Sequence, residues 1–224
     1  MNRTLTWLSL GIVACLSLEA SDPSHDPSRD TSPPPSPEFK RPPHALFADD
    51  FSSADLRGWS CDSTNGAWSV RNGMLRGELP DVKQAHSFLR AGDSTWTDYA
   101  VDLDVCGMRG VDKGIGVRVH KKTGLGVDLR GADYQDVVMY VGKFPVGGGK
   151  ATNTSGAWSH MRVEIRGNSC RVVIDDHVAF DKHLRFHAPA HGGIVLAAYA
   201  GGIGQCTVYY DNVVVTALEA APDP

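Results

Sequence analysis

The chain has 224 residues, with 22 lysines and arginines, 26 aspartates and glutamates, and a formal net charge of −4. This balance excludes the basic surface that nucleic-acid-binding domains present. The length suits one all-β domain, and the 24 glycines and 13 prolines are typical of a turn-rich β protein with a proline-rich segment attached.

Residues 1–20 are predicted to be a signal peptide. Arg3 supplies a small positive charge, and the apolar run from Leu5 to Ala14 is too short for a helix that spans a hydrocarbon core of about 30 Å. The run ends in Ile12-Val13-Ala14-Cys15, which resembles the lipobox of bacterial lipoproteins. The resemblance implies lipidation of Cys15 and a membrane anchor, and the alternative is cleavage after Ala20. Both predict an extracytoplasmic protein.

Residues 16–44 are predicted to form a disordered linker. Within it, residues 21–37 are rich in serine and proline, include Pro33-Pro34-Pro35-Ser36-Pro37, and have almost nothing apolar to bury. Such a segment cannot offset its ordering entropy, and its prolines favour an extended polyproline spacer. The linker would hold the following domain away from a membrane or wall.

From residue 45 to 218 the hydrophobic pattern has a period of two. Asn72-Gly73 supplies the two residues that a type I′ hairpin turn needs, between strands near Trp68 and Leu75. Apolar and polar residues alternate over 99–106, 115–120 and 125–130. Each strand thus has one buried (dry) face and one solvent-exposed (wet) face, which is typical of antiparallel sheets packed on one side.

A second hairpin is predicted around Gly167-Asn168. This turn would set Ile165 opposite Cys170 and Glu164 opposite Arg171, the latter as a cross-strand ion pair. The core face would then consist of alternate residues of both strands: Met161, Val163, Ile165, Cys170, Val172 and Ile174. Two packed antiparallel sheets bury such stripes best, so the predicted fold is an all-β, two-sheet sandwich, with residues 219–224 as a disordered tail.

The order of these segments resembles the concanavalin A-like lectin/glucanase jelly roll, especially the branch with laminin-G-like domains and the 3-keto-disaccharide hydrolase family. The resemblance covers residues 46–217 and is carried by strand and turn motifs: Asp49-Asp50-Phe51 with Gly58-Trp59, the Trp68–Leu75 hairpin, Trp96–Val105, Trp158–Asn168 and Tyr210-Asp211-Asn212-Val213. The resemblance implies the jelly-roll fold. It says little about activity, because one fold can have many functions.

The chain departs from the enzymes of this fold in its acidic residues. Family-sixteen glycoside hydrolases carry Glu-x-Asp-x-x-Glu on one strand, and this motif is absent from the sequence. Of the five glutamates, Glu19 and Glu38 precede the predicted domain. The Asn-Ser-Gly-Ile and Tyr-Glu-x-Gln stretches associated with 3-keto-disaccharide hydrolases are also missing.

The wet face of the central strands is the predicted functional surface. By strand parity its members point away from the core: Asp102, Asp104, Arg118, His120, Asp128, Arg130 and Tyr140. In this fold carbohydrate lies across the outer face of one sheet, so the predicted carbohydrate ligands are Asp102, Arg118, His120, Asp128, Arg130 and Tyr140. The alternative is a solvated face with cross-strand ion pairs. For a hydrolase, Asp104 and Asp128 are the candidate carboxyl pair, with His120 as a further catalytic candidate.

A calcium site is predicted where the first and last strands of the domain meet. If first and last strands pair, the oxygen ligands of Asp49, Asp50, Asp211 and Asn212 would suit a structural Ca²⁺, and otherwise these residues cap turns and satisfy backbone groups.

With Cys15 set aside, four cysteines remain in an oxidising compartment. The predicted disulfides are Cys106–Cys206 and, less firmly, Cys61–Cys170, with a free buried thiol at Cys170 as the alternative.

The sequence therefore predicts an exported, lipid-anchored domain that binds a glycan at the cell envelope. The first alternative is a glycoside-processing hydrolase of the 3-keto-disaccharide type. The second is a protein-adhesion module of laminin-G character, with calcium in a structural role. Neither nucleic acid nor a cofactor other than calcium is expected as a ligand.

Overall fold

The computed structural model describes residues 32–38, 40–61, 67–131, 134–184, 187–202 and 204–219. Within these ranges the chain forms fifteen strands and no helix. No helix long and apolar enough to cross a membrane therefore occurs in the described part of the chain. The prediction of an all-β domain is confirmed.

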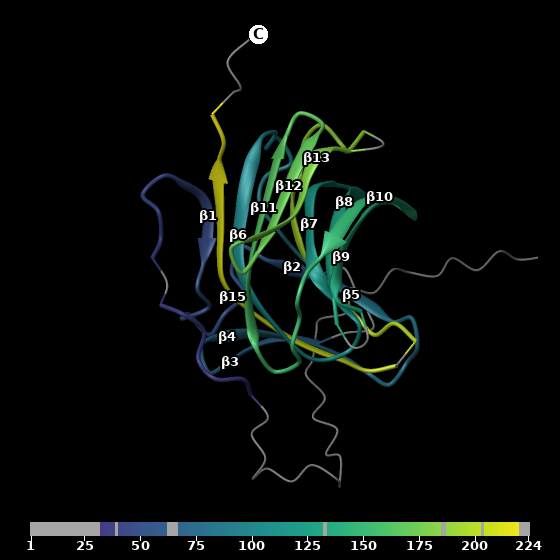
Figure 1. Ribbon diagram of the computed structural model, residues 1–224. Helices are drawn as coiled ribbons and strands as arrows, with labels where there is room; N and C mark the ends of the chain where they lie inside the picture. Colours follow the sequence, from purple (N-terminus) through teal and green to yellow (C-terminus); the bar gives the residue numbers. More distant parts are fainter. Residues whose placement is uncertain are drawn as a thin grey trace, which may run out of the picture. The chain divides into compact units, whose positions relative to one another are not determined.

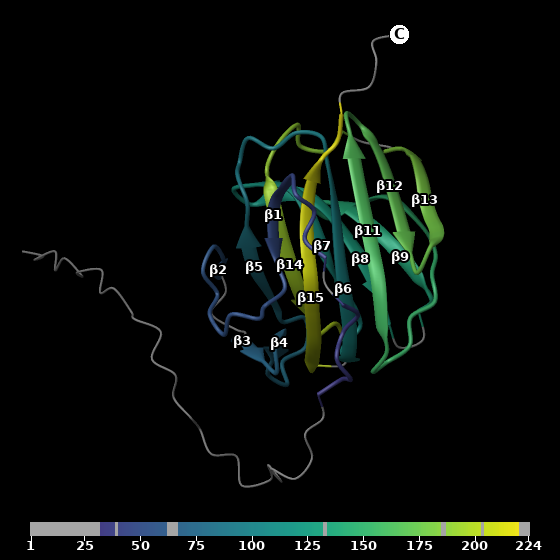
Figure 2. The ribbon, with the colours of Figure 1, turned by 90° about the vertical axis from the view of Figure 1, so that its left-hand side faces the viewer.

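The strands form two antiparallel sheets that pack face to face as a jelly-roll sandwich (Figures 1 and 2). The eight-stranded sheet contains, in spatial order, β13 (His177–His183), β12 (Ser169–Ile174), β11 (Trp158–Arg166), β6 (Tyr99–Arg109), β15 (Cys206–Ala217), β4 (Met74–Leu79) and β3 (Ala67–Arg71), with β1 (Ala45–Asp49) also paired to β15. The seven-stranded sheet contains β10 (Phe144–Lys150), β9 (Asp136–Val141), β8 (Thr123–Arg130), β7 (Asp112–His120), β14 (Gly193–Tyr199), β5 (His86–Ala91) and β2 (Ser60–Cys61).

The core lies between the two sheets and is built from the inward residues of each strand. The predicted core face of β11 and β12 is confirmed, since its six members are at most 2% exposed. Strand β6 contributes Val101 and Leu103, and β8 contributes Val127 and Leu129 from the other sheet. The outward residues of the same strands are therefore available to form two separate surfaces, one on each sheet.

Both predicted hairpins are present. Asn72 and Gly73 have φ angles of 53° and 74°, the left-handed conformation that Asn-Gly adopts readily, and they join β3 to β4. In the second hairpin Ile165 pairs with Cys170 and Glu164 with Arg171, in the predicted register.

The first and last strands also pair, with Asp49 opposite Val213. The predicted Glu164–Arg171 ion pair does not form, because Glu164 binds Arg162 and Arg171 lies near Asp181.

Two buried tyrosines connect the sheets. Tyr210 of β15 donates its hydroxyl to the carbonyl of Ala197 on β14 at 2.5 Å and accepts the amide of Gly114 on β7 at 2.9 Å. Tyr99 of β6 accepts the amide of Arg118 in the same way. These bonds fix the backbone of the central strands of the seven-stranded sheet, on whose outer face the candidate site lies.

Candidate functional site

A groove of about 270 Å³ lies on the outer face of the seven-stranded sheet. Its lining includes Gly116 of β7, Gly126 of β8 and Ala197 of β14, which form the floor. They are the outward neighbours of core residues such as Ile115 and Val127, since side chains alternate along a strand. The sequence thus places its smallest side chains in the middle of one exposed face, and the hollow follows from that placement.

Aromatic and charged side chains line the same groove. Tyr140 on β9 and Phe88 on β5 are both half-buried and offer ring surface. The charged lining residues are Arg90, Lys122 and Asp128. An apolar hollow with a few polar groups is the usual composition of a small-molecule site.

Asp128 is the most perturbed carboxyl in the groove. Burial, followed by the nearby Asp112 carboxylate, raises the pKa of Asp128 to about 7, and Arg130 opposes this rise. Asp128 lies opposite Gly114 on β7, so that the residue directly across the ladder has no side chain to cover it. A carboxyl that titrates near neutrality in a groove is a candidate proton acceptor or donor.

Asp112 is the diagonal neighbour of Asp128 across β7 and β8, because Asp112 pairs with Arg130 and Gly114 with Asp128. Diagonal neighbours have Cα atoms roughly 7 to 8 Å apart. Burial raises the pKa of Asp112 as well, and its Oδ1 atom is buried without a hydrogen-bond partner among the described residues. Two acids that are costly to ionise together therefore lie next to each other on this face, Asp128 in the groove and Asp112 beside it.

Arg130 is held in place beside these acids. Its Nε and Nη2 atoms donate to the two carboxylate oxygens of Asp136 at 2.8 and 2.5 Å, and its guanidinium lies 4.2 Å from the ring centre of Tyr134. Asp128, Arg130 and Tyr140 thus share one face, as predicted from strand parity. Their role as carbohydrate ligands stays a prediction.

The other predicted members of this surface lie elsewhere. Asp102 and Asp104 are on β6, which belongs to the eight-stranded sheet, so they face the opposite side of the sandwich. The prediction of a single wet face is therefore wrong: parity separates inward from outward residues but does not say which sheet a strand joins. Asp104 and Asp128 lie on outer faces of different sheets and cannot flank one glycosidic bond.

Arg118 is buried, and its contacts stabilise the fold. A bulge interrupts the pairing of β7 and β8 after Val117, and Arg118 adopts a left-handed φ of 48° there. Its guanidinium turns inward, binds Asp98 at 2.6 Å and donates to the carbonyls of Thr97, Gly167 and Pro189. The bulge shifts the alternation by which the sequence placed this side chain outside.

His120 follows the bulge and lies in a second hollow of about 350 Å³ near Ser60 and Lys121. Its ring contacts that of His191, with centroids 5.2 Å apart. His120 is therefore not beside Asp128 in the lining of the groove.

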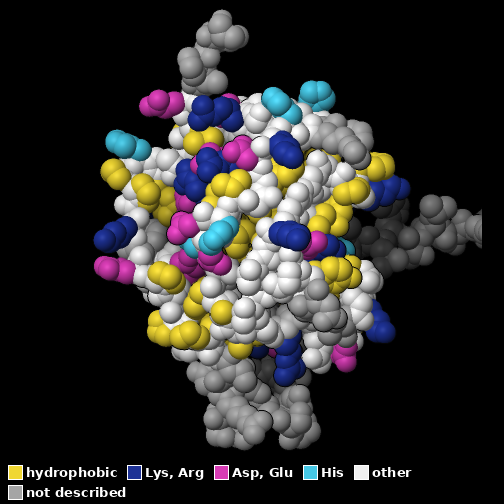
Figure 3. Space-filling model, viewed as in Figure 1, with side chains coloured by type: hydrophobic (Ala, Val, Ile, Leu, Met, Phe, Trp, Pro, Cys, Tyr) yellow, Lys and Arg dark blue, Asp and Glu magenta, His cyan; other side chains and the backbone are white. Residues whose placement is uncertain are grey.

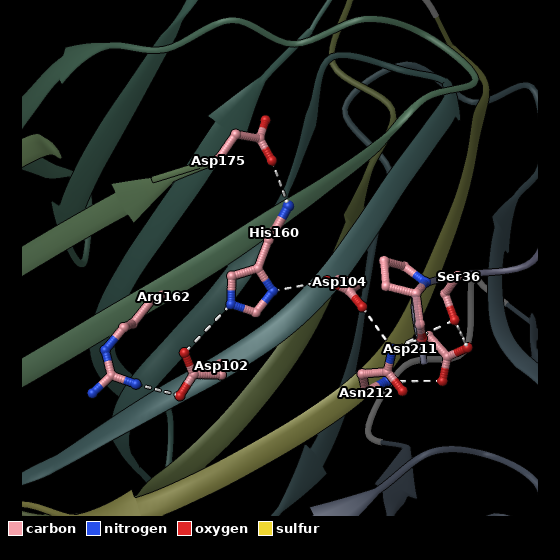
Figure 4. Close-up of polar contacts among 9 residues, drawn as sticks. Ser36, Asp102, Asp104, His160, Arg162, Asp175, Asp211 and Asn212 are labelled. Atoms are coloured by element: carbon pink, nitrogen blue, oxygen red, sulfur yellow. Dashed lines mark hydrogen bonds and ion pairs between the residues drawn. The ribbon is translucent and has the colours of Figure 1, made fainter. Parts of the chain in front are cut away.

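The eight-stranded sheet carries a charged cluster around His160 that is not among the sites predicted from the sequence. His160 on β11 places Nδ1 2.8 Å from Asp104 Oδ1 and Nε2 3.5 Å from Asp102 Oδ1 (Figure 4). These hydrogen bonds to Asp102 and Asp104 raise the pKa of His160 to about 10, so the ring is a cation at neutral pH. Arg162 donates to the other oxygen of Asp102 at 2.5 Å and to Glu164 at 2.7 Å.

In Figure 3, acidic, basic and histidine side chains gather on this face in the region of β6 and β11. The signal was present in the sequence, since His160, Arg162 and Glu164 are the outward complement of the predicted core face of this strand. What the sequence did not contain was the pairing of β11 with β6, which puts His160 opposite Asp104.

The model of one family, the 3-keto-alpha-glucoside-1,2-lyase-like domain, matches residues 46–216. The chain belongs to this family. The match covers the whole sandwich and ends within β15, in agreement with the resemblance found in the sequence. No curated protein matches the chain.

Several solved structures share the fold of this family member at low identity. A carbohydrate-binding module of family 66 from Bacillus subtilis is 18% identical with a TM-score of 0.58, over 71% of this chain and 96% of that one. A galectin-like protein of unknown function from the same species is 12% identical with a TM-score of 0.64, over 82% and 100%. A beta-1,3-1,4-glucanase from a mouse hindgut metagenome is 13% identical with a TM-score of 0.60, over 77% and 99%.

The four residues of the predicted calcium site point to different partners. Asp49 accepts the indole N–H of Trp59 at 2.7 Å, and Asp50 accepts from Ser52 in its own turn. Asp211 accepts from Ser36, while Asn212 donates to Asp104. Within the described ranges no group of three or more His, Cys, Asp or Glu residues is placed to hold a metal ion. Calcium binding by the family member stays a prediction.

The predicted disulfides are absent from the structure. Strands β6 and β15 are antiparallel neighbours, as expected, but Tyr209 rather than Cys206 pairs with Cys106, and both thiols are free. Cys170 is a free thiol in the core, as its alternative reading predicted, whereas Cys61 lies exposed on β2 of the other sheet. Cys15 and the predicted signal peptide lie outside the described residues.

Proposed function

We propose that this domain binds carbohydrate in the groove on the outer face of its seven-stranded sheet. One observation carries the proposal: a floor of Gly116, Gly126 and Ala197 lies between the rings of Tyr140 and Phe88. A sugar ring has an apolar face that stacks on aromatic side chains, and its hydroxyls pair with carboxylates and guanidinium groups. The likeness to a carbohydrate-binding module and to a glucanase supports the same reading at the level of the fold.

A glycan array, run with and without calcium, identifies the ligand, and calorimetry on its best hit tests the site. We expect Tyr140→Ala to weaken binding about three- to tenfold, the worth of one stacking contact of roughly 1 kcal/mol. The matched control is Arg171→Ala on the opposite sheet, which should bind as the wild type does. Binding that survives Tyr140→Ala and Asp128→Ala unchanged would move the ligand to another surface.

The second candidate is catalysis on a 3-keto glycoside, which the name of the family implies and the near-neutral pKa of Asp128 favours. In such an elimination the Asp128 carboxylate takes the proton from C2, which the adjacent ketone acidifies. The C–H electron pair becomes the C1–C2 double bond, and the C1–O bond breaks. The leaving oxygen then takes a proton from water.

Incubation with a 3-keto-α-glucoside at pH 6 to 8 tests this chemistry by release of the aglycone. We expect turnover to rise as Asp128 ionises and to be lost in Asp128→Asn. Binding of the same sugar without release of the aglycone at any pH would leave the domain a binding module.

The laminin-G-like adhesion reading has no such support. It requires a contiguous apolar patch on the surface. Among the described residues, the large apolar side chains that are exposed come from different segments of the chain: Leu46, Val82, Tyr134, Phe144 and Val178.

We further propose that the protein is exported and held at the membrane through a lipidated Cys15. The proposal rests on the apolar run and on Ile12-Val13-Ala14-Cys15. Metabolic labelling with palmitate in a bacterial host should mark the wild type and not Cys15→Ser, and the variant should leave the membrane fraction. Equal labelling of both chains would exclude this anchor.

A further inference from the structure

Part of the predicted linker is attached to the domain. The indole N–H of Trp158 on β11 donates to the carbonyl of Pro34 at 2.7 Å, and the carboxamide of Asn212 on β15 donates to the carbonyl of Pro37 at 2.8 Å. Between them, Ser36 donates its hydroxyl to Asp211 at 2.5 Å (Figure 4). In Figure 2 the segment that precedes β1 lies in front of β15 and β6.

The spacing of these contacts fits a polyproline II helix. In Pro33-Pro34-Pro35-Ser36-Pro37, proline fixes φ, and every residue that precedes a proline is biased toward extended backbone. A polyproline II helix has three residues per turn, so the carbonyls of Pro34 and Pro37 lie on the same side. The sheet therefore supplies two side-chain donors, from Trp158 and Asn212, to carbonyl groups that are one turn apart on the same side of the segment.

The receiving surface is shaped for this contact. The pairing of β15 with β6 is irregular between Asp211 and Val214, and Asn212 there has a left-handed φ of 53°. Bulges redirect side chains, and this one aims the Asn212 amide outward at Pro37 and Asp104. Asparagine adopts this left-handed conformation more readily than most other non-glycine residues.

An apolar platform lies beside these donors. Met74, Cys106 and Tyr209 form a small buried cluster, separate from the main core, against which Trp158 packs. Cys106 pairs with Trp158 on one side and Tyr209 on the other, which places the cluster across β11, β6 and β15. Pro33, next to the residue that binds Trp158, is itself buried. An aromatic platform with an indole donor is how polyproline-binding modules hold their ligands.

We infer that the outer face of the eight-stranded sheet is a polyproline-binding surface whose resident ligand is the chain's own Pro33–Pro37 segment. The segment precedes residues 46–216, so it lies outside the part of the chain that defines the family. Docked there, it makes the chain enter the domain on the face opposite the groove. This docked segment, here called the tether, thus lies on the sheet opposite the groove.

The test follows the indole N–H of Trp158 in ¹H–¹⁵N spectra of the full chain, assigned by its loss in Trp158→Phe. We compare the wild type with a variant in which Pro33, Pro34 and Pro35 are replaced by glycine. Replacement of Pro42 and Pro43 by glycine is the matched control, since neither side chain takes part in the contacts described. The indole of Trp158 should shift and exchange faster with solvent in the first variant only.

A synthetic peptide with the sequence of residues 32–38 completes the test. Added to the triple-glycine chain, it should return the Trp158 signal toward its wild-type position, whereas the wild type should not respond because its surface is occupied. An indole signal that is unchanged by the glycine replacements, or that moves equally in the control, would overturn the inference. A failure to find any glycan ligand would leave these signals intact, so the two proposals fail separately.

Discussion

Asp128 links the charge of the groove to the stability of the fold. Its pKa of about 7 in the folded state lies above the value of about 3.9 in an unfolded chain, so folding takes up a proton. The folded state is then favoured at low pH, and its stability falls as the pH rises between these two values.

We therefore expect Asp128→Asn to raise the free energy of unfolding, by on the order of 2 kcal/mol at pH 8 and little at pH 4. Urea denaturation at both pH values measures the difference. Asp181→Asn, at an exposed carboxylate on β13, should show no such trend. If Asp128→Asn raises the free energy of unfolding equally at both pH values, the surroundings of Asp128 do not disfavour its ionised form.

Arg118 shows the opposite case, a charge that is needed for folding. Its guanidinium is nearly fully buried and serves Asp98 and three carbonyls. Arg118→Met should cost about 3 to 5 kcal/mol of unfolding free energy, because it leaves those groups without their donor. Chemical denaturation tests this. A stable Arg118→Met chain that has lost only glycan affinity would restore the predicted role of Arg118 as a ligand.

The groove exists because β7 and β8 carry glycine, with no side chain, at its floor: Gly116 and Gly126. A Cβ added at Gly126 would meet nothing closer than the Tyr140 carbonyl at 3.9 Å, so the backbone tolerates a side chain there. Gly126→Val should fill the floor and lower glycan affinity at least about tenfold, a change of only ~1.4 kcal/mol. It should also raise the stability of the strand by up to about 1 kcal/mol.

Calorimetry and thermal unfolding on the same samples separate these two effects. Gly202→Val is the control, since a Cβ there also meets open space but lies away from the groove. Wild-type affinity in Gly126→Val would show that the ligand does not occupy the floor of the groove.

The strands themselves could be predicted, because local patterns specify them. Asn72-Gly73 and Gly167-Asn168 set two hairpins in the right register, and alternation separated buried from outward side chains along β11 and β12. The sheet that each strand joins depends on long-range pairing, which a period of two does not encode. Hence Asp102 was grouped with Asp128, and His160 was not recognised as a partner of Asp104. Bulges at Arg118 and Asn212 are equally invisible, since each breaks the alternation on which the prediction depends.

At the scale of the molecule, the sandwich separates two surfaces of different composition. The face of the seven-stranded sheet is hollow and partly aromatic, whereas that of the eight-stranded sheet carries paired charges and the docked Pro33–Pro37 segment. This division predicts that the tether and the groove lie on opposite sides.

A nitroxide on Glu38→Cys tests this division in a chain that also carries Cys15→Ser and Cys61→Ser. It should broaden the amide signals of Asp211 and His160 strongly and those of Gly116 and Gly126 far less, with the reduced label as reference. Equal, weak broadening on both faces would indicate a tether that moves freely around the domain.

Carbohydrate binding in the groove can be observed residue by residue, by titrating the labelled full chain with the best glycan from the array and following its amide signals. If the glycan binds in the groove, the signals of Gly116, Gly126, Tyr140 and Ala197 should shift with its concentration, while those of His160 and Arg162 should stay unchanged. Shifts confined to the face of His160, or no shift with any glycan, would contradict binding in the groove.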